Sequence, residues 1–72
     1  MKYLAGRAQG VIRWIKRDIG MILADAGVGI LFHSTELIGT DWPSEICGTR
    51  VTYATGITKR GKPRALAVRK QS

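Results

Sequence analysis

The sequence predicts an all-β fold, a small antiparallel barrel of five strands with Greek-key connections. Nine glycines and two prolines interrupt its 72 residues at short intervals, and this spacing favours short strands over helices. The stretches between them are rich in Val, Ile, Thr, Tyr and Phe, residue types that strands prefer. Because so small a sheet is most stable when it closes on itself and hides its edges, we expect a barrel.

The strands are expected at residues 10–16, 19–25, 29–33, 49–56 and 63–70. The turns are expected at Arg17-Asp18, Ala26-Gly27 and Ile57 to Lys62. Ser34 to Ile38 suits a single helical turn, with Ser34 as its N-cap and Leu37 pointing inward. A loop of turn-forming residues around Trp42 then leads into the fourth strand.

Alternation along the strands predicts which side chains face the core. The predicted inward set on the second and third strands is Gly20, Ile22, Ile30 and Phe32. The predicted outward set on the same strands is Ile19, Met21, Leu31 and His33. A bulge would shift such a register by one residue. On the last two strands the alternating pairs are Val51 and Tyr53 against Thr52 and Ala54, and Ala65 and Ala67 against Leu66 and Val68.

The length allows one domain, residues 1–72, with a core over about residues 10–70. Residues 1–8 and 71–72 are expected to be flexible. No apolar run approaches the ~20 residues of a membrane span, and Arg7 interrupts any hydrophobic segment that could act as a secretory signal. We therefore expect a soluble, cytoplasmic protein that does not contact membranes.

Residues that carry catalytic or metal chemistry are scarce. Cys47 is the only cysteine and His33 the only histidine, so a single chain assembles neither a disulfide nor a zinc site of Cys and His ligands. His33 and Ser34 are adjacent, and adjacent side chains on a strand point to opposite faces, so they do not form a nucleophile and base pair. We expect no enzymatic activity, no metal and no cofactor.

The formal net charge of +7 is concentrated at the two ends of the chain. All five acidic residues fall between residues 18 and 49, a stretch without Lys or Arg, whereas residues 1–17 hold five cations and residues 50–72 hold seven. If the fold brings the first and last strands together, these cations form one positive region that attracts polyanions. A basic surface that serves solubility is the alternative.

Five short motifs follow one another along most of the chain. They are Gly10-Val-Ile-Arg-Trp-Ile15, Ile19-Gly-Met-Ile22, Ile30-Leu-Phe-His-Ser-Thr35, Gly48-Thr-Arg-Val51 and Arg60-Gly-Lys-Pro-Arg-Ala-Leu-Ala-Val68. In this order and spacing they resemble the motifs of the cold-shock domain family. That resemblance implies a five-stranded barrel of the OB type that binds single-stranded RNA or DNA.

The resemblance also implies which residues bind. Family members stack bases on phenylalanines, and in this sequence those places hold Ile19, Met21, Leu31 and Ser34. The stacking candidates that remain are Trp14, His33 and Trp42. Since a stacked base contributes about 1–3 kcal/mol, losing several platforms weakens binding unless the cations compensate.

These residues define the predicted site. Bases are expected against Trp14, His33 and Trp42, with Met21 and Leu31 as an apolar floor. Phosphates are expected at Arg13, Lys16, Arg17, Lys59, Arg60, Lys62 and Arg64. The hypothesis is a non-catalytic module that binds single-stranded RNA or DNA through charge, with weak sequence selectivity.

Two aromatic side chains and the apolar surface have a second interpretation. Trp14 is either an exposed stacking residue or a partly buried barrel residue, and Trp42 caps the barrel as readily as it binds. Ile19, Met21 and Leu31 around an indole also suit a protein partner. The alternative function is therefore a protein-interaction module, for example a regulator of the transcription or translation machinery. The sequence leaves the oligomeric state open.

Overall fold

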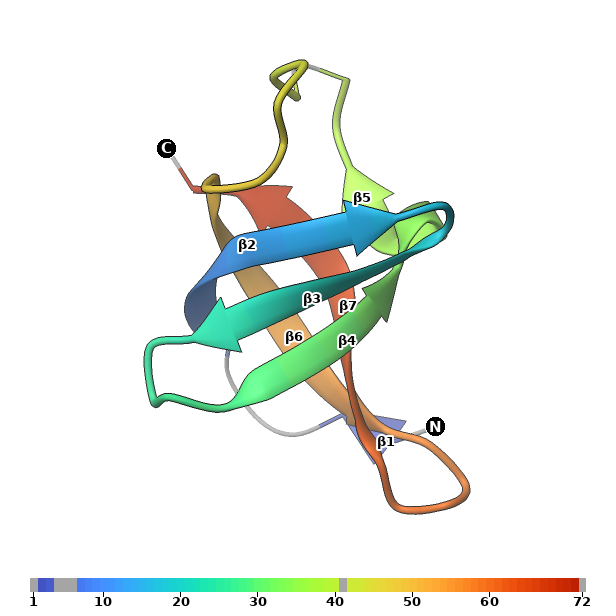
Figure 1. The fold of residues 1–72 in the computed structure, drawn as a ribbon. Helices are drawn as coiled ribbons and strands as arrows, with labels where there is room; N and C mark the ends of the chain where they lie inside the picture. Colours follow the sequence, from blue (N-terminus) through green and yellow to red (C-terminus); the bar gives the residue numbers. More distant parts are fainter. Residues whose placement is uncertain (1, 4–6, 41, 72) are drawn as a thin grey trace.

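The structure is a computed structural model that describes residues 2–3, 7–40 and 42–71. Over these residues the chain forms seven strands and one short 3-10 helix. In order they are β1 (Lys2–Tyr3), β2 (Ala8–Lys16), β3 (Ile19–Ala24), β4 (Gly29–His33), η1 (Ser34–Glu36), β5 (Leu37–Ile38), β6 (Arg50–Ile57) and β7 (Pro63–Lys70). Figure 1 shows the long strands wrapped around one another, with the loop between β6 and β7 projecting from one end.

Five strands close the barrel in the order β6, β2, β3, β4 and β7, and β7 pairs back onto β6. These pairings are antiparallel except that between β4 and β7, which is parallel and consists of the single pair Leu31 and Arg64. The short strands β1 and β5 extend the sheet beyond β6 and β7. The predicted five-stranded Greek-key barrel is confirmed, and the predicted strands are the five that close it.

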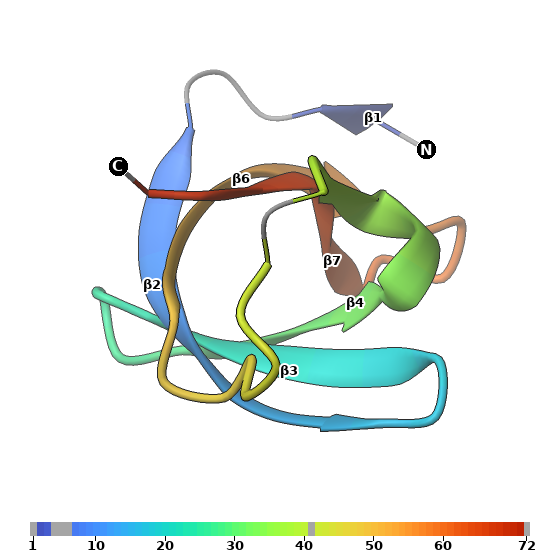
Figure 2. The same cartoon turned by 90° about the horizontal axis from the view of Figure 1, so that it is seen from above.

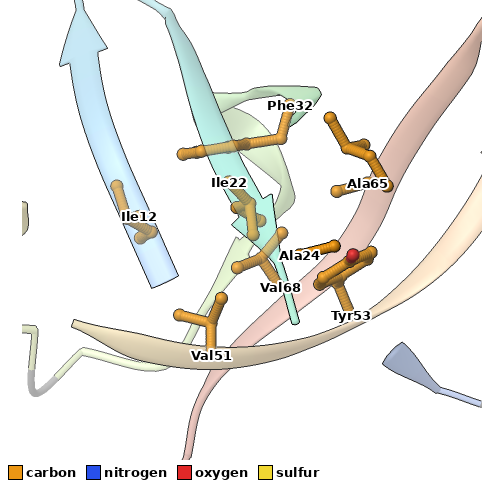
Figure 3. Close-up of a cluster of buried hydrophobic side chains, with 9 residues drawn as sticks. Ile12, Ile22, Ala24, Phe32, Val51, Tyr53, Ala65 and Val68 are labelled. Carbon is orange, nitrogen blue, oxygen red and sulfur yellow. The ribbon is translucent and has the colours of Figure 1, made fainter. Parts of the chain in front are cut away.

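The barrel encloses an apolar core, to which β2, β3, β4, β6 and β7 all contribute side chains (Figure 3). Its buried members are Ile12, Ile22, Ala24, Ile30, Phe32, Val51, Tyr53, Ala65 and Val68. The predicted inward positions on β3 and β4 are confirmed, and on β6 the inward pair is Val51 and Tyr53. Gly20 is buried opposite Phe32, and a Cβ at position 20 would overlap the Phe32 ring. Glycine is therefore required there by packing.

Strand β7 does not follow simple alternation. Ala65, Leu66 and Val68 are all buried, while Ala67 has a φ of 50°, in the left-handed region. Between Thr52 and Ala54 the β6–β7 register shifts, so that one residue of β6 faces two residues of β7. This irregularity is a β-bulge, so neither alternating set predicted for the last strand is the inward set.

The guanidinium of Arg7 supports this bulge. Its Nη2 atom donates to the carbonyl oxygens of Ala67, at 2.7 Å, and Thr52, at 2.9 Å. Ala8, the next residue, begins β2. Arg7 and Ala8 belong to residues 1–8, which were expected to be flexible together with residues 71–72. Of these two segments, residues 1, 4–6 and 72 lie outside the described residues.

The helical turn is present, but its cap is not the one predicted. Ser34 is the first residue of η1, and His33 is the N-cap, because its Nδ1 atom accepts from the Thr35 N–H at 3.2 Å. Ser34 as N-cap was therefore wrong by one residue. Leu37 packs against the core, as predicted.

The segment between β5 and β6 covers one end of the barrel. Seen from above, it crosses over the opening (Figure 2). Trp42 is half-buried in this segment and packs against the core together with Ile46. Its Nε1 donates to the Ile38 carbonyl at 3.1 Å.

Tyr53 gives the fold a sensitivity to alkaline pH. Its hydroxyl is buried and has no hydrogen-bond partner among the described residues. Burial, and secondarily the negative charge of Asp25, raises the pKa of Tyr53 above its ordinary value of 10.0. The stability that comes from keeping this phenol neutral is fully present below pH 10 and is lost as pH rises through the folded-state pKa.

We expect Tyr53→Phe to remove this component of alkaline destabilisation and to stabilise the protein by about 1 kcal/mol at neutral pH, because an unsatisfied buried hydroxyl is costly. Guanidinium unfolding of both proteins at pH 7 and at pH 10.5 measures the difference. An identical pH dependence in the two proteins would contradict the role assigned to Tyr53.

Candidate nucleic-acid interface

A β-bulge in β2 decides where Trp14 points. Ile12 pairs with Ile22, but Trp14 pairs with Met21, so Arg13 is an extra residue on this strand. Regular alternation from the buried Ile12 would turn Trp14 into the core. The extra residue instead places the Trp14 side chain outside, where it is 41% exposed. Ile15, the next residue, packs against the core.

The ladder arranges the outward residues in two rows across the barrel. The first row runs Trp14, Met21, Leu31 and Arg64, over β2, β3, β4 and β7. The second row runs Lys16, Ile19 and His33. Directly opposed side chains on neighbouring strands lie about 5 Å apart at their Cβ atoms. We call the surface formed by Trp14, Lys16, Ile19, Met21, Leu31 and His33 the β2–β4 face.

The β2–β4 face is apolar at its centre and basic at its margin. Ile19 is 42% exposed, and Met21 and Leu31 are half-buried. A shallow depression of about 530 Å³ opens at the end of β2. It is lined by Trp14, Lys16, Arg17, Asp18 and Ile19. An indole is thus placed beside two cations and only one carboxylate.

His33 combines a structural contact with an available donor. Its Nδ1 accepts from the Thr35 N–H and lies 2.9 Å from the Thr35 hydroxyl oxygen. Because a backbone amide only donates, Nδ1 is unprotonated in the neutral ring and Nε2 carries the hydrogen. The exposed His33 ring therefore offers an N–H donor to a ligand.

The turn between β2 and β3 is tied to the end of β4. The Ser34 N–H donates to the Asp18 carbonyl at 2.7 Å, and the Ser34 hydroxyl donates to the Asp18 carboxylate at 3.5 Å. Arg17 lies in this turn with a φ of 57°. This role of Asp18 and Ser34 could not be predicted from the sequence, because the two residues are 16 positions apart and no local pattern joins them.

The other predicted cations lie at two further places. Lys59, Arg60 and Lys62 are exposed on the loop between β6 and β7. Thr58 closes this loop, because its N–H donates to the Lys62 carbonyl and its hydroxyl accepts from the Lys62 N–H. Arg13 is exposed at the bulge beside Trp14.

The structure therefore brings together the strand residues of the predicted site, and it leaves Trp42 and the cations of the β6–β7 loop apart from them. Trp14, Met21, Leu31, His33 and Arg64 lie in adjacent positions of the two rows. Trp42 does not join them, because its ring packs on the core from the segment over the barrel end. A residue that the sequence analysis missed is Glu36, which lines a second depression beside Leu31 and His33.

In the part of the chain that the structure describes, no group of three or more His, Cys, Asp or Glu side chains is arranged to hold a metal ion. None of the helical structure in the described residues is long and apolar enough to cross a membrane.

Comparison with known proteins identifies the fold. No protein-family model matches the sequence, and no curated protein matches it. A solved structure of Drosophila Unr, CSD456, is similar, with a TM-score of 0.77 and 22% sequence identity. The match covers 93% of this chain and 27% of that chain. The resemblance inferred from the motifs is thus confirmed for the fold, since this protein has the OB-type barrel of a cold-shock domain.

Proposed function

We propose that this protein is a non-catalytic module that binds single-stranded RNA or DNA on the β2–β4 face. The observation that carries the proposal is the row of Trp14, Met21 and Leu31 on three adjacent strands, with cations at its ends. An aromatic platform beside a basic groove is the arrangement by which proteins hold single strands. The cold-shock fold supports the same conclusion by analogy.

In this proposal the base contacts come from few side chains. Trp14 stacks on one base, His33 contacts another, and Met21 and Leu31 form the floor between them. Stacking on a ring is tolerant of sequence, because every base has a π-face, so the selectivity is weak. Trp42 takes no part, because its indole N–H and its ring are already engaged.

The phosphate contacts come from cations on both sides of the face. Lys16 and Arg17 lie beside Trp14, and Arg64 ends the row on β7. The loop after β6 adds Lys59, Arg60 and Lys62. Among the described residues none of these six cations forms an ion pair, so their charge is available to a polyanion.

A protein-interaction module is the second candidate. The observation that favours it is the exposure of Trp14 and Ile19 next to Met21, since aromatic residues and Met are enriched in protein interfaces. A protein partner would cover the same β2–β4 face.

The proposal predicts strong salt dependence. Counterion release gives a slope of log K against log salt of about −0.7 per phosphate on single strands, so contacts with three or four phosphates imply a slope of about −2 to −3. Titration of the tryptophan fluorescence with a short oligonucleotide at several salt concentrations measures it. An affinity that does not change with salt would exclude the phosphate contacts.

The proposal also predicts that the two tryptophans differ. Trp14→Ala should weaken oligonucleotide binding by about 1–3 kcal/mol and leave the barrel folded, because an exposed platform contributes little to the core. The matched control, Trp42→Ala, should lower the stability by about 2 kcal/mol, because its ring packs on the core. Binding is measured by calorimetry and folding by thermal denaturation. If Trp14→Ala unfolds the protein, Trp14 is a core residue.

A third variant separates the two candidate functions. Met21→Phe combined with Leu31→Phe places two rings in the row beside Trp14, so it should tighten binding to single strands, because a planar ring offers a base more contact than an aliphatic chain. If the face serves a protein partner instead, the double variant should gain less than about threefold for nucleic acid and lose the partner, whose fit depends on the present side chains. Oligonucleotide titration beside pull-down from a cell extract distinguishes the two results.

A further inference from the structure

A second depression, of about 400 Å³, lies beside the β2–β4 face where β4 and β7 meet. We call it the β4–β7 cleft. It is lined by apolar side chains of β3, β4 and β7 together with His33, Glu36, Thr58 and Arg64. Most of these side chains are apolar, and the volume falls within the range of pockets that hold small organic groups.

The cleft follows from the way in which the barrel closes. The β4 and β7 strands share only the Leu31 and Arg64 pair in their ladder. The lining therefore includes two core residues, Phe32 and Ala65. Leu66 is also apolar, is 7% exposed and does not belong to the core cluster.

Besides Thr58, three polar or charged side chains border this apolar space. Glu36 Oε1 accepts from the Ala67 N–H at 3.0 Å, which holds the carboxylate in position. A carboxylate has about four acceptor positions, so this bond leaves acceptor capacity for a ligand. His33 offers its Nε2 hydrogen, and Arg64 offers a positive charge.

We propose that the β4–β7 cleft receives one unstacked base of a bound strand, and that Glu36 selects a base with an exocyclic amino group. This inference rests on the proposed function. A carboxylate accepts a hydrogen bond from the amino group of cytosine. Uracil has a carbonyl oxygen at the same position, and two acceptors facing each other are unfavourable. Glu36 thus adds a preference for cytosine over uracil to an otherwise tolerant face.

Charge complementarity favours a nucleotide over a protein side chain as the occupant. Arg64 lies in the cleft wall, and Thr58 in the same wall begins the loop that carries Lys59, Arg60 and Lys62. A base in the cleft brings its phosphate near these cations. An apolar side chain of a protein would fill the same space without using them.

The test compares oligocytidylate and oligouridylate of equal length. Wild-type protein should bind oligocytidylate about tenfold more tightly. Glu36→Gln should lose or reverse this preference, because its amide oxygen still accepts from the Ala67 N–H while its amide nitrogen donates to the carbonyl of uracil. The readout is the ratio of the two dissociation constants. The separate constants do not isolate the role of Glu36, because removing a negative charge from the protein tightens the binding of both strands.

Glu45→Gln is the matched control. It makes the same change of charge, and Glu45 lines neither depression. Its Oε1 accepts from the Cys47 N–H at 3.2 Å, a bond that an amide oxygen also forms. The cytosine to uracil ratio should therefore stay at the wild-type value in this variant.

A strand of pyrimidin-2-one nucleotides, which lack the amino group, tests the idea on the wild-type protein without dependence on the folding of a variant. It should bind more weakly than oligocytidylate, because it offers Glu36 no amino hydrogen. If it binds as tightly as oligocytidylate, or if Glu36→Gln folds and leaves the ratio unchanged, the role of Glu36 is wrong, while the proposed function stands. If neither oligonucleotide binds wild-type protein, both proposals are wrong and a protein partner becomes the occupant to test.

Discussion

The extra residue at Arg13 is the constraint on which the outer surface depends. In a strand every second side chain faces the core, and an added residue reverses the order beyond it. Here the reversal brings Ile15 inward and leaves Trp14 outside. It also places Trp14 opposite Met21, so that the indole continues the row that Leu31 extends onto β4. Without the bulge the core would have to hold an indole, and the face would lack its one large ring.

A second constraint is the seam between β4 and β7. A barrel of five strands must close on itself, and this one closes through a single parallel pair. Because the ladder between β4 and β7 is so short, the space between the two strands is lined mainly by side chains. His33, as the cap of η1, and Glu36, through its bond to Ala67, fix the helical turn beside this space. The turn therefore has polar groups in defined positions next to an apolar cleft.

Some cations of the protein stabilise the fold, and others are available for binding. Arg7 is used internally, because its guanidinium satisfies carbonyl groups at the bulge of β7. Arg50 pairs with Asp25 at 2.8 Å, on the surface, where such a pair contributes little stability. Among the described residues none of the cations around the β2–β4 face forms an ion pair, and Arg64 donates to the adjacent Pro63 carbonyl at 2.9 Å. Their mutual repulsion is relieved by a polyanion, which is consistent with the proposed function.

The sequence by itself determined the fold class, the five barrel strands and the inward positions on β3 and β4, because strand alternation and turn chemistry are local properties of the chain. Motif order also predicted the cold-shock fold. Only the tertiary structure decided the exposure of Trp14, the packing of Trp42 on the core, the inward set of β7 and the position of Glu36 in a cleft. Each of these four features depends on which residues far apart in the chain become neighbours. A bulge or a single cross-strand pair determines these neighbours, and neither leaves a periodic signal in the sequence.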